Sequence, residues 1–184
     1  YLEKFDLPIN VMQNREVLVR ASKDLVNYLE KENVIYAEVR FSPIFHVREG
    51  LSYDEVVEAV IEGLSSNKNV ETNLILSMMR GMDKKTNIKV IEVASKYLGK
   101  GVCAVDLAGA EDKYPLSEYE DLFDNWLEIN FIYAESLIFQ ANDKMMDVVK
   151  YIFDVLEKKH ITDSTKLCRA HLLLALINTI KGNL

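Results

Sequence analysis

The clearest candidate for chemistry is the motif Asp106-Leu107-Ala108-Gly109-Ala110-Glu111, which ends an apolar run of the sequence. Folds with parallel strands place their binding and catalytic groups where the strands end. Asp106 offers a hydrogen-bond acceptor at such a place, and Gly109 lets a ligand approach the backbone because it has no Cβ. An ordinary turn explains the same residues, since Asp and Gly commonly close strands. The spacing alone leaves both interpretations open and favours the turn.

A second group of polar residues consists of charged side chains on two predicted strands. Glu38 and Arg40 lie two residues apart, so their side chains share one face of an extended segment. Arg80 follows Met78-Met79 at the end of the next apolar run. These charges either face the interior or mouth of a barrel, or form a structural network of ion pairs that holds the strands in register. We favour the structural network.

Histidine spacing bears on whether the chain can bind a metal. The chain has three histidines, His46, His160 and His171, and they form neither H-x-H nor H-x-x-x-H. Such spacings are what hold a zinc ion from one strand or one helix. Thr162-Asp163 lies between the last two histidines and is typical of a helix cap, which separates them. The sequence therefore predicts no metal ligand set from this chain alone, and it contains no P-loop.

Composition and cysteine usage narrow the class of partner and the compartment. Cys103 and Cys168 form no C-x-x-C pair, and Cys103 lies in an apolar run, so we expect a buried free thiol and a cytoplasmic protein. The formal net charge is -7 without long runs of one sign, which argues against a nucleic-acid-binding surface. No apolar segment approaches the roughly 20 residues that span a bilayer. We therefore expect neither a nucleic-acid nor a membrane partner.

These side chains need elements to position them, and helical and strand patterns alternate along the first two-thirds of the chain. A whole helix separates consecutive strands, which requires parallel strands with helical crossovers. No G-x-G-x-x-G follows a strand, so a barrel-like sheet is favoured over a dinucleotide-binding fold. Two helices are predicted to begin at capping boxes, Ser52–Glu55 and Ser117–Glu120. The predicted strands are 34–41, 72–79 and 101–107, with a weaker fourth signal at 131–134, and the helices are 15–32, 52–64, 84–98 and 117–128.

The last part of the chain has only helical patterns, over 143–159 and 163–180. Because a complete barrel needs about eight strands, we predict an α/β fold: an incomplete (β/α) barrel-like parallel sheet with helical crossovers and a helical C-terminal part. We expect a partial barrel region over residues 1–135 and a helical segment of unknown role over residues 136–184. Leu172–Ile177 is apolar around most of a helix, which indicates burial on more than one side.

Four segments resemble the metal-dependent adenosine deaminase family, in the family's order and spacing, across about residues 1–130. They are Leu2-Glu3-Lys4-Phe5-Asp6, similar to L-x-x-F-D; Ala37-Glu38-Val39-Arg40-Phe41-Ser42-Pro43, similar to E-V-R-[FY]-S-P; Met79-Arg80, similar to M-R; and the motif from Asp106 to Glu111, similar to D-L-A-G-x-E. The resemblance implies a (β/α)8 barrel that hydrolyses adenosine or deoxyadenosine to inosine or deoxyinosine and ammonia. It also implies a zinc ion that activates water and a Glu that protonates the purine ring.

The resemblance also implies roles for individual residues of this chain. Gly109 matches the family Gly whose backbone N–H contacts the purine, and Asp106 matches the strand-end Asp of that motif. Tyr1, Leu2 and Phe5 match the apolar helix that covers the nucleoside pocket. The substrate-binding residues implied in this way are Gly109, Asp106, Leu2 and Phe5. Met79-Arg80 matches a strand-end support near the site.

The chain departs from the family pattern at the metal-binding and catalytic positions. The resemblance places the first-strand H-x-H before Tyr1, and an H-A-G-E with a metal His and the catalytic Glu near residue 133. There the chain reads Phe131-Ile132-Tyr133-Ala134-Glu135, in which Tyr133 and Glu135 replace ligand and acid only if the motif is shortened. The family segments H-G-x-R and S-x-N-[ST]-D-[DN] are not found. Zinc is thus a family cofactor without identifiable ligands in this chain, and the catalytic residues stay unassigned.

Three interpretations of function remain open. The first is an adenosine deaminase in lineage, present as a partial chain that lacks most catalytic residues and is inactive alone. The second is a non-catalytic half-barrel whose exposed sheet edges pair with a second copy or with a partner chain. The third is a by-product with no function of its own. A purine nucleoside is the expected ligand, and an H-x-H encoded upstream of Tyr1 would favour the first interpretation.

Overall fold

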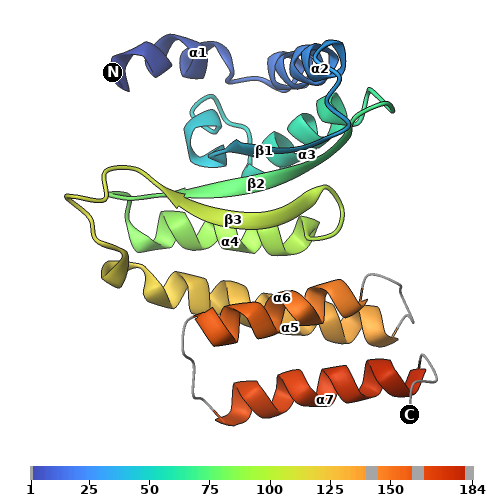
Figure 1. The fold of residues 1–184 in the computed structure, drawn as a ribbon. Helices are drawn as coiled ribbons and strands as arrows, with labels where there is room; N and C mark the ends of the chain where they lie inside the picture. Colours follow the sequence, from blue (N-terminus) through green and yellow to red (C-terminus); the bar gives the residue numbers. More distant parts are fainter. Residues whose placement is uncertain (1, 140–144, 159–163, 181–184) are drawn as a thin grey trace. The chain divides into compact units, whose positions relative to one another are not determined.

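A computed structural model of the chain describes residues 2–139, 145–158 and 164–180 (Figure 1). The chain divides into two compact units, residues 1–122 and residues 123–184. Unit 1 contains a parallel sheet with its crossover helices, and unit 2 is helical. The domain boundary expected near residue 135 stays a prediction.

Unit 1 is built around three parallel strands in the order β1-β2-β3. They are β1 (Tyr36–Phe41), β2 (Glu71–Met79) and β3 (Val102–Ala108), and both neighbouring pairs run parallel. The predicted parallel α/β fold is therefore confirmed. The other elements of unit 1 are η1 (Leu2–Phe5), α1 (Asp6–Val11), α2 (Arg15–Lys31), η2 (Pro43–His46), α3 (Tyr53–Leu64), α4 (Lys84–Tyr97) and η3 (Leu116–Glu118).

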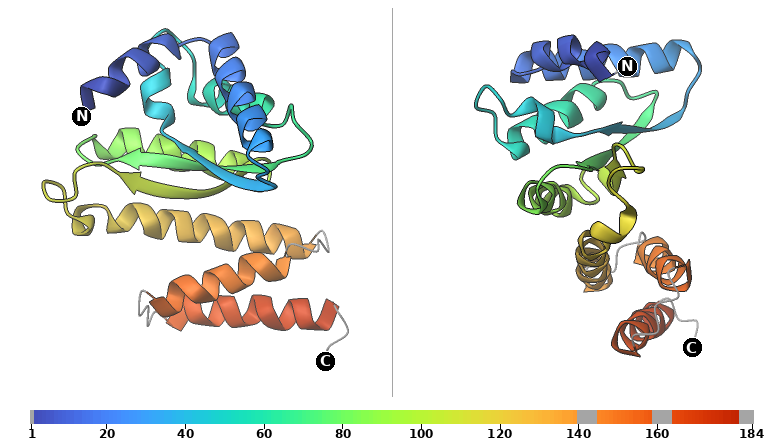
Figure 2. Two further views of the ribbon diagram at one scale, coloured as in Figure 1. Left: turned by 45° about the horizontal axis from the view of Figure 1, so that its top comes forward. Right: turned by 90° about the vertical axis from the view of Figure 1, so that its left-hand side faces the viewer.

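Local signals in the sequence fix where the crossover helices begin. Ser52 and Glu55 form the predicted capping box at the start of α3, each side chain accepting from the other's backbone N–H. Asp83 caps α4 by accepting from the backbone N–H of Thr86. Helix α3 also carries Gly63, where a Cβ would collide with the backbone of α2, so α2 and α3 pack closely. Figure 2 shows these helices and the sheet from two further directions.

The two faces of the sheet differ in chemistry. Leu74, Leu76 and Met78 of β2 are fully buried and point toward the side that α3 and α4 cover. The opposite face carries polar side chains, among them Arg40 of β1 and Asp106 of β3. This division follows from the alternation of side chains along a strand, and it places the predicted site residues on one face.

A β-bulge in β3 determines which face Asp106 joins. Leu74 pairs with Val102, but the next residue of β2, Ile75, pairs with Ala104, so Cys103 is an extra residue in the ladder. Beyond the bulge Ser77 pairs with Asp106. Without the extra residue, Asp106 would fall on the face of the fully buried side chains, because a one-residue shift reverses the orientation of every following side chain.

Unit 2 consists of α6 (Met145–Lys158), α7 (Ser164–Ile180) and most of α5 (Glu120–Phe139). Its core is a cluster of apolar side chains from all three helices, and Phe131, Ile152 and Ile177 within it are fully buried. Among the described residues, no helix combines the length and apolar character that crossing a membrane demands.

The prediction of a fourth strand at 131–134 is wrong, because these residues lie in the middle of α5. Aromatic and β-branched residues at this position favour a strand locally. Burial instead follows a helical period: the buried residues of α5 are Leu122, Trp126, Leu127, Asn130, Phe131 and Ala134. Packing against α6 and α7 therefore overrides the local preference. Helix α5 also begins at Glu120, after the short helix η3, and not at the predicted box at Ser117.

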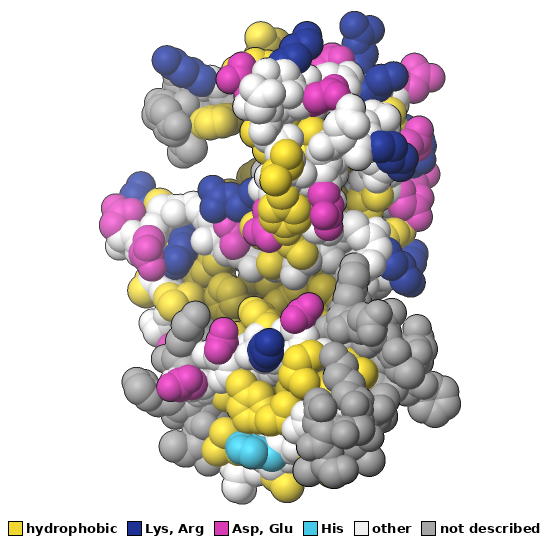
Figure 3. Space-filling view, turned by 45° about the vertical axis from the view of Figure 1, so that its right-hand side comes forward, with side chains coloured by type: hydrophobic (Ala, Val, Ile, Leu, Met, Phe, Trp, Pro, Cys, Tyr) yellow, Lys and Arg dark blue, Asp and Glu magenta, His cyan; other side chains and the backbone are white. Residues whose placement is uncertain are grey.

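Helix α7 is apolar on more than its buried side. Leu173 and Ile177 are buried in the core of unit 2, whereas Leu172 and Leu176 are exposed. Figure 3 shows hydrophobic side chains gathered around a histidine on one face of unit 2. Unit 2 therefore buries one side of α7 and leaves Leu172 and Leu176 exposed. Association of the chain through such a surface stays a proposal.

Candidate functional site

The candidate site lies at the carboxyl ends of the three strands. Arg40 of β1 donates from Nη1 to Oδ2 of Asp106 on β3, at 2.8 Å. The pair crosses β2, whose Ser77 is the register partner of Asp106 and is itself buried. The predicted structural network is thus present for Arg40, with Asp106 as its partner. Glu38 does not join this pair through the contacts described, and instead accepts from the hydroxyl of Tyr36 at 2.8 Å.

The second carboxylate oxygen of Asp106 is the most distinctive polar atom of the site. Oδ1 is buried and has no hydrogen-bond partner among the described residues. An unpaired buried acceptor costs roughly 1–3 kcal/mol, so such atoms need an explanation. A ligand that donates a hydrogen bond to Oδ1 would remove this cost. Asp106 thus combines a fixed orientation, set by Arg40, with a free acceptor position.

Arg80 anchors the loop that follows β3. Its side chain is 7% exposed, and its guanidinium donates to the carbonyl of Tyr114 at 2.6 Å and to Glu111 at 3.0 Å. The backbone N–H of Arg80 donates to the carbonyl of Ala108 at 2.8 Å. A buried Arg with several fixed acceptors is a rigid support, so the loop carrying Gly109 is held in one place.

Two glycines allow this loop to lie close to the end of β2. Gly109 has φ +118°, and a Cβ there would lie 2.9 Å from the Cβ of Arg80. Gly81 has φ +79°, and a Cβ there would lie 3.0 Å from the ring of Tyr114. The N–H of Gly81 also donates to the hydroxyl of Tyr119 at 2.9 Å. Only glycine fits both positions without displacing a neighbour.

Asn87 supports the same strand ends and was not found from the sequence. This fully buried side chain on α4 accepts from the N–H of Met79 at 2.9 Å and donates to the carbonyl of Met79 at 3.0 Å. It thereby completes the backbone hydrogen bonding of β2 just before Arg80. The sequence did offer a signal for Asn87, because this polar residue shares the buried side of α4 with Val90 and Ile91.

The N-terminal segment is tied to the same end of the sheet. Gln13 follows α1 and donates to the carbonyl of Phe45 in η2 at 2.7 Å, while its Oε1 accepts from the N–H of Arg48 at 3.1 Å. Phe5 lies on η1 and its side chain is 48% exposed, and the side chain of Leu2 is outside the described set. The contacts of Gln13 place the end of α1 beside η2, which follows β1, and the cover over the site by Leu2 and Phe5 stays a prediction.

The histidines do not come together. His46 is buried, and its Nδ1 donates to the carbonyl of Met12 at 2.8 Å. Burial lowers the pKa of His46, and the nearby charge of Arg48 lowers it further, against a raising effect of the bond to Met12. His171 lies in unit 2 with Nδ1 against the carbonyl of Leu167, and His160 is outside the described residues.

The residues proposed as replacements for the family's metal ligand and acid lie in a helix. Tyr133 and Glu135 are in helix α5 and not in a strand, and their side chains are outside the described set. Within the described parts of the chain, no three His, Cys, Asp or Glu side chains form a group that could hold a metal ion. The polar groups described at the strand ends, an Asp paired with an Arg and a buried Arg, do not fit a zinc site, since zinc is held by three or four ligands drawn from His, Cys, Asp and Glu.

Both cysteines are free thiols. Cys103 is half-buried at the bulge, where its Sγ–H donates to the carbonyl of Leu74 at 3.3 Å. Burial raises the pKa of Cys103 to about 11, with a further contribution from the charge of Glu38. Cys168 is exposed on α7. A thiol with a raised pKa is a poor nucleophile, so Cys103 does not add a reactive group to the site.

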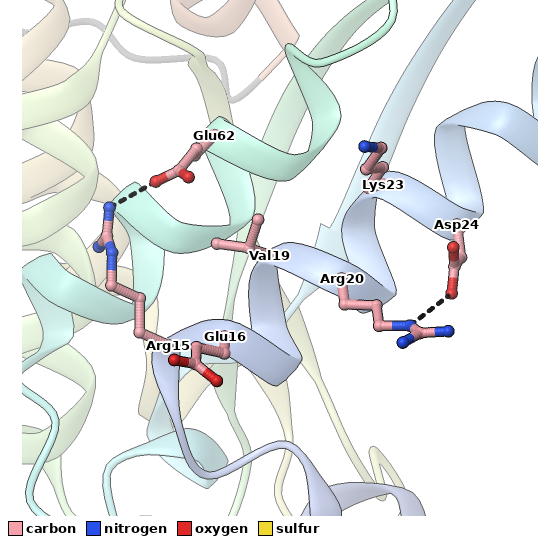
Figure 4. A pocket seen from close by; sticks show the side chains of 7 residues that line it. All are labelled: Arg15, Glu16, Val19, Arg20, Lys23, Asp24 and Glu62. Atoms are coloured by element: carbon pink, nitrogen blue, oxygen red, sulfur yellow. Dashed lines mark hydrogen bonds and ion pairs between the residues drawn. The ribbon is translucent and has the colours of Figure 1, made fainter.

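A cavity of about 530 Å³ lies away from the strand ends, between α2 and α3. Figure 4 shows that charges of both signs surround it: Arg15 pairs with Glu62 at 2.6 Å, and Arg20 approaches Asp24 at 3.7 Å. Because these cations are neutralised by carboxylates on the same helices, the cavity offers no net charge for a ligand. The strand ends remain the better candidate.

The adenosine deaminase family model matches residues 1–135 of the chain. The chain belongs to this family. An adenosine deaminase of Clostridium kluyveri is 39% identical over 126 residues, covering 67% of this chain and 36% of the relative. One from Clostridium botulinum strain Kyoto is 43% identical over 119 residues, covering 62% of this chain and 36% of the relative. The chain therefore spans about a third of the length of these curated relatives.

Solved structures similar to this adenosine deaminase family member agree with the fold. An Arabidopsis protein, ADAL, in complex with GMP aligns with a TM-score of 0.54 at 27% identity, over 62% of this chain and 35% of that one. An amidohydrolase of Burkholderia ambifaria with bound Zn aligns with a TM-score of 0.53 at 17% identity, over 64% and 32% of the two chains. At that identity the second likeness shows the fold alone.

Proposed function

We propose that residues 1–122 form the nucleoside-binding part of an adenosine deaminase-type site. The observation that carries the proposal is the carboxylate of Asp106, which Arg40 holds at 2.8 Å while the buried Oδ1 has no partner among the described residues. A nucleoside carries hydrogen-bond donors that can bind to this oxygen. Membership of the family supports a purine nucleoside as the ligand.

In this proposal each residue of the strand ends has a distinct task. Asp106 accepts a hydrogen bond from the bound nucleoside, and Gly109 presents its backbone N–H to the purine ring. Arg80 positions Gly109 by holding the following loop through Glu111 and Tyr114. Leu2 and Phe5 cover the nucleoside. The complex of the related ADAL protein with GMP shows that a purine ligand binds one member of this structural group.

Hydrolysis is a separate matter, because the zinc chemistry of the family needs ligands that do not come together among the described residues. When bound, zinc would supply a hydroxide near neutral pH. We assign no step of hydrolysis to this chain's own residues, which bind and orient the nucleoside. The expected result is that the 184-residue chain forms inosine from adenosine no faster than buffer. A cytoplasmic location is part of the same proposal, and the two free thiols support it.

Titration calorimetry of the full chain with adenosine, and separately with cytidine as the comparison nucleoside, tests this function. We expect adenosine to bind and cytidine to bind at least about tenfold more weakly, a difference of roughly 1.4 kcal/mol. Asp106→Asn should weaken adenosine binding by about tenfold or more, whereas Asp112→Asn, an exposed residue of the following loop, should not change it. Equal binding of both nucleosides, or unchanged binding by Asp106→Asn, would overturn the proposal.

An assay for inosine with added zinc tests the second half of the proposal. The expected outcome is no product above the buffer rate, with adenosine binding retained. Inosine formation that a chelator abolishes would show that this chain assembles a metal site after all. The two assays separate binding from hydrolysis, since either result can occur without the other.

A further inference from the structure

Two buried side-chain atoms have no hydrogen-bond partner among the described residues, Oδ1 of Asp106 and Oγ of Ser42. The candidate site gives Asp106 a role and leaves Ser42 without one. Ser42 directly follows β1 and is 8% exposed. Its side chain makes no capping hydrogen bond to η2, the short helix that begins at the next residue. No described contact therefore gives this hydroxyl a structural role.

The place of Ser42 on the sheet follows from the register of β1 and β2. Their ladder reaches Leu76 of β2, so the next residues of the two chains, Ser42 and Ser77, come in line with each other. The backbone of Ser42 is still extended, with φ -104° and ψ 115°. Because side chains alternate along an extended chain, Ser42 shares the polar face of the sheet with Arg40.

The same line continues into β3. Ser77 is the register partner of Asp106, and the three strands lie side by side (Figure 1). Ser42, Ser77 and Asp106 thus form one row of polar side chains across the carboxyl ends of the sheet, which we call the strand-end row. Both of its serines are buried. The two unpaired atoms lie at the two ends of this row.

The two ends of the strand-end row have complementary hydrogen-bonding chemistry. An ionised carboxylate oxygen only accepts, whereas a serine hydroxyl also donates. Neighbouring strands are about 4.8 Å apart, so the backbones of Ser42 and Asp106 are separated by about 10 Å across β2. A ligand that serves both ends needs a donor and an acceptor on a rigid frame. Adenine has this arrangement, because its amino group lies next to ring nitrogens that accept.

The base of a nucleoside is better placed to reach this row than its ribose. Gly109 follows Asp106 by three residues and lies just beyond the end of β3. In the proposed function the N–H of Gly109 contacts the purine ring. A ring held at that loop turns one of its edges toward the strand-end row, which is carried by the preceding part of the same strand.

We propose that Ser42 is a further substrate-binding residue, whose hydroxyl donates to a ring nitrogen of the purine. The amino group of the same base donates to Oδ1 of Asp106. Binding then pairs both buried atoms that the free chain leaves unpaired, which removes the cost of each. This inference rests on the proposed nucleoside site, and it adds the group of the ligand that is recognised at the end of β1.

Ser42→Ala tests the proposal, because a binding role and a structural role predict opposite results. Removal of an unpaired hydroxyl should leave the Tm of the free chain unchanged or higher, while adenosine binding weakens by about tenfold. Ser22→Ala is the matched control, since Ser22 is also 8% exposed but donates to the carbonyl of Leu18 at 2.8 Å. The control should lower the Tm by about 2–8 °C and leave adenosine binding unchanged.

A second nucleoside separates the contact of Ser42 from that of Asp106. Purine riboside keeps the ring nitrogens of adenosine and lacks the amino group. In titration calorimetry of the full chain, Ser42→Ala should weaken both nucleosides by the same factor. Asp106→Asn should weaken adenosine by about tenfold more than purine riboside, because only adenosine has the donor for Oδ1.

Three results would overturn the assignment of Ser42. They are adenosine binding by Ser42→Ala equal to that of the unaltered chain, a loss of Tm as large as that of Ser22→Ala, and weaker binding of adenosine alone. Loss of binding in Asp106→Asn with none in Ser42→Ala refutes this inference and leaves the proposed function standing. Absence of adenosine binding by the unaltered chain refutes both, so the two failures are distinguishable.

Discussion

The two units of this chain are stabilised in different ways. In unit 1, buried polar side chains such as Asn87 and Arg80 make specific hydrogen bonds to backbone groups of neighbouring loops and strands. In unit 2, the described core cluster consists of apolar side chains, among them the fully buried Phe131, and the buried Asn130 donates to the carbonyl of Trp126 within its own helix. The family match covers residues 1–135, and so includes all of unit 1 and only the first part of unit 2.

This difference shows where sequence identity is constrained by geometry. A polar side chain that satisfies two backbone groups has few substitutes, because the wrong replacement leaves a buried group unpaired. A helical core tolerates exchange among apolar residues of similar volume. The four segments that resemble the family accordingly lie in unit 1, three of them in or at the ends of β1, β2 and β3.

The largest expected effect tests whether the units are stabilised independently. Phe131 is fully buried, and the guanidinium of Arg169 lies 4.8 Å from its ring centre. Phe131→Ala should lower the free energy of unfolding of unit 2 by about 3–5 kcal/mol, from lost burial and the cavity left behind. Hydrogen exchange should then rise in α6 and α7 but not in β2. Leu172→Ala, at an exposed position, is the control, and equal loss of protection in β2 would contradict the separation.

The next effect addresses the polar support of unit 1. Asn87→Ala leaves the N–H and C=O of Met79 without their partner, and we expect a loss of about 2–4 kcal/mol in the free energy of unfolding. Denaturant unfolding monitored in unit 1 measures it. Asn73→Ala is the control, since the contact described for the Asn73 side chain is a long, exposed hydrogen bond to the hydroxyl of Tyr36 at 3.4 Å. An equal loss in the free energy of unfolding for both variants would contradict the support of β2 by Asn87.

A smaller effect concerns the close approach of the two loops. Gly109→Ala combines an unfavourable φ of +118° with a collision at the Cβ of Arg80, and should cost about 1–3 kcal/mol. Gly50→Ala has a similar φ of +101° but no atom within 4 Å of the added Cβ. The difference in thermal stability between these variants therefore measures the collision alone. Identical stabilities would mean that the loop moves away at no cost.

The smallest effect is a pH dependence confined to unit 1. Burial lowers the pKa of His46 below the value of 6.5 that the unfolded chain has. Above that pH both states are neutral and the stability is full; as pH falls below 6.5, the unfolded state takes up a proton first, so stability declines toward the folded pKa. His46→Gln, whose amide can still donate to Met12, should flatten this slope. Denaturant midpoints between pH 5 and pH 8 provide the measurement, and an unchanged slope would contradict the role of His46.

Much of the fold of unit 1 could be predicted because its local signals agree with its tertiary structure. The three strands are rich in β-branched, aromatic and other apolar residues and are bounded by residues such as Pro43 and Gly99. The box at Ser52 fixes the start of α3. Residues 131–134 were wrongly predicted to form a strand because composition over four residues cannot outweigh the packing of a 20-residue helix. Long-range burial, not local preference, decides that segment.

The site was predictable in position but not in its contacts. Asp106 and Gly109 could be placed at a strand end from their motif, and Arg40 could be expected in an ion pair. The pairing of Arg40 with Asp106 could not be foreseen, because it depends on the extra residue at Cys103, which leaves no mark in composition. Asn87 was missed for a related reason: its place on the buried side of α4 was a signal, but its partners are backbone groups of β2, outside its own helix.

The bulge at Cys103 also makes the orientation of Asp106 depend on the number of residues that precede it in β3. Between Val102 and Asp106 the chain counts one residue more than the facing stretch of β2 from Leu74 to Ser77. A deletion of a single codon there would turn Asp106 toward the helices and Leu107 toward Arg40, exchanging the polar and apolar sides beyond that point. Substitutions of the residues between Val102 and Asp106 should therefore keep the orientation of Asp106, whereas insertions and deletions of one residue should reverse it. The number of residues between Val102 and Asp106 therefore decides which face of the sheet Asp106 joins.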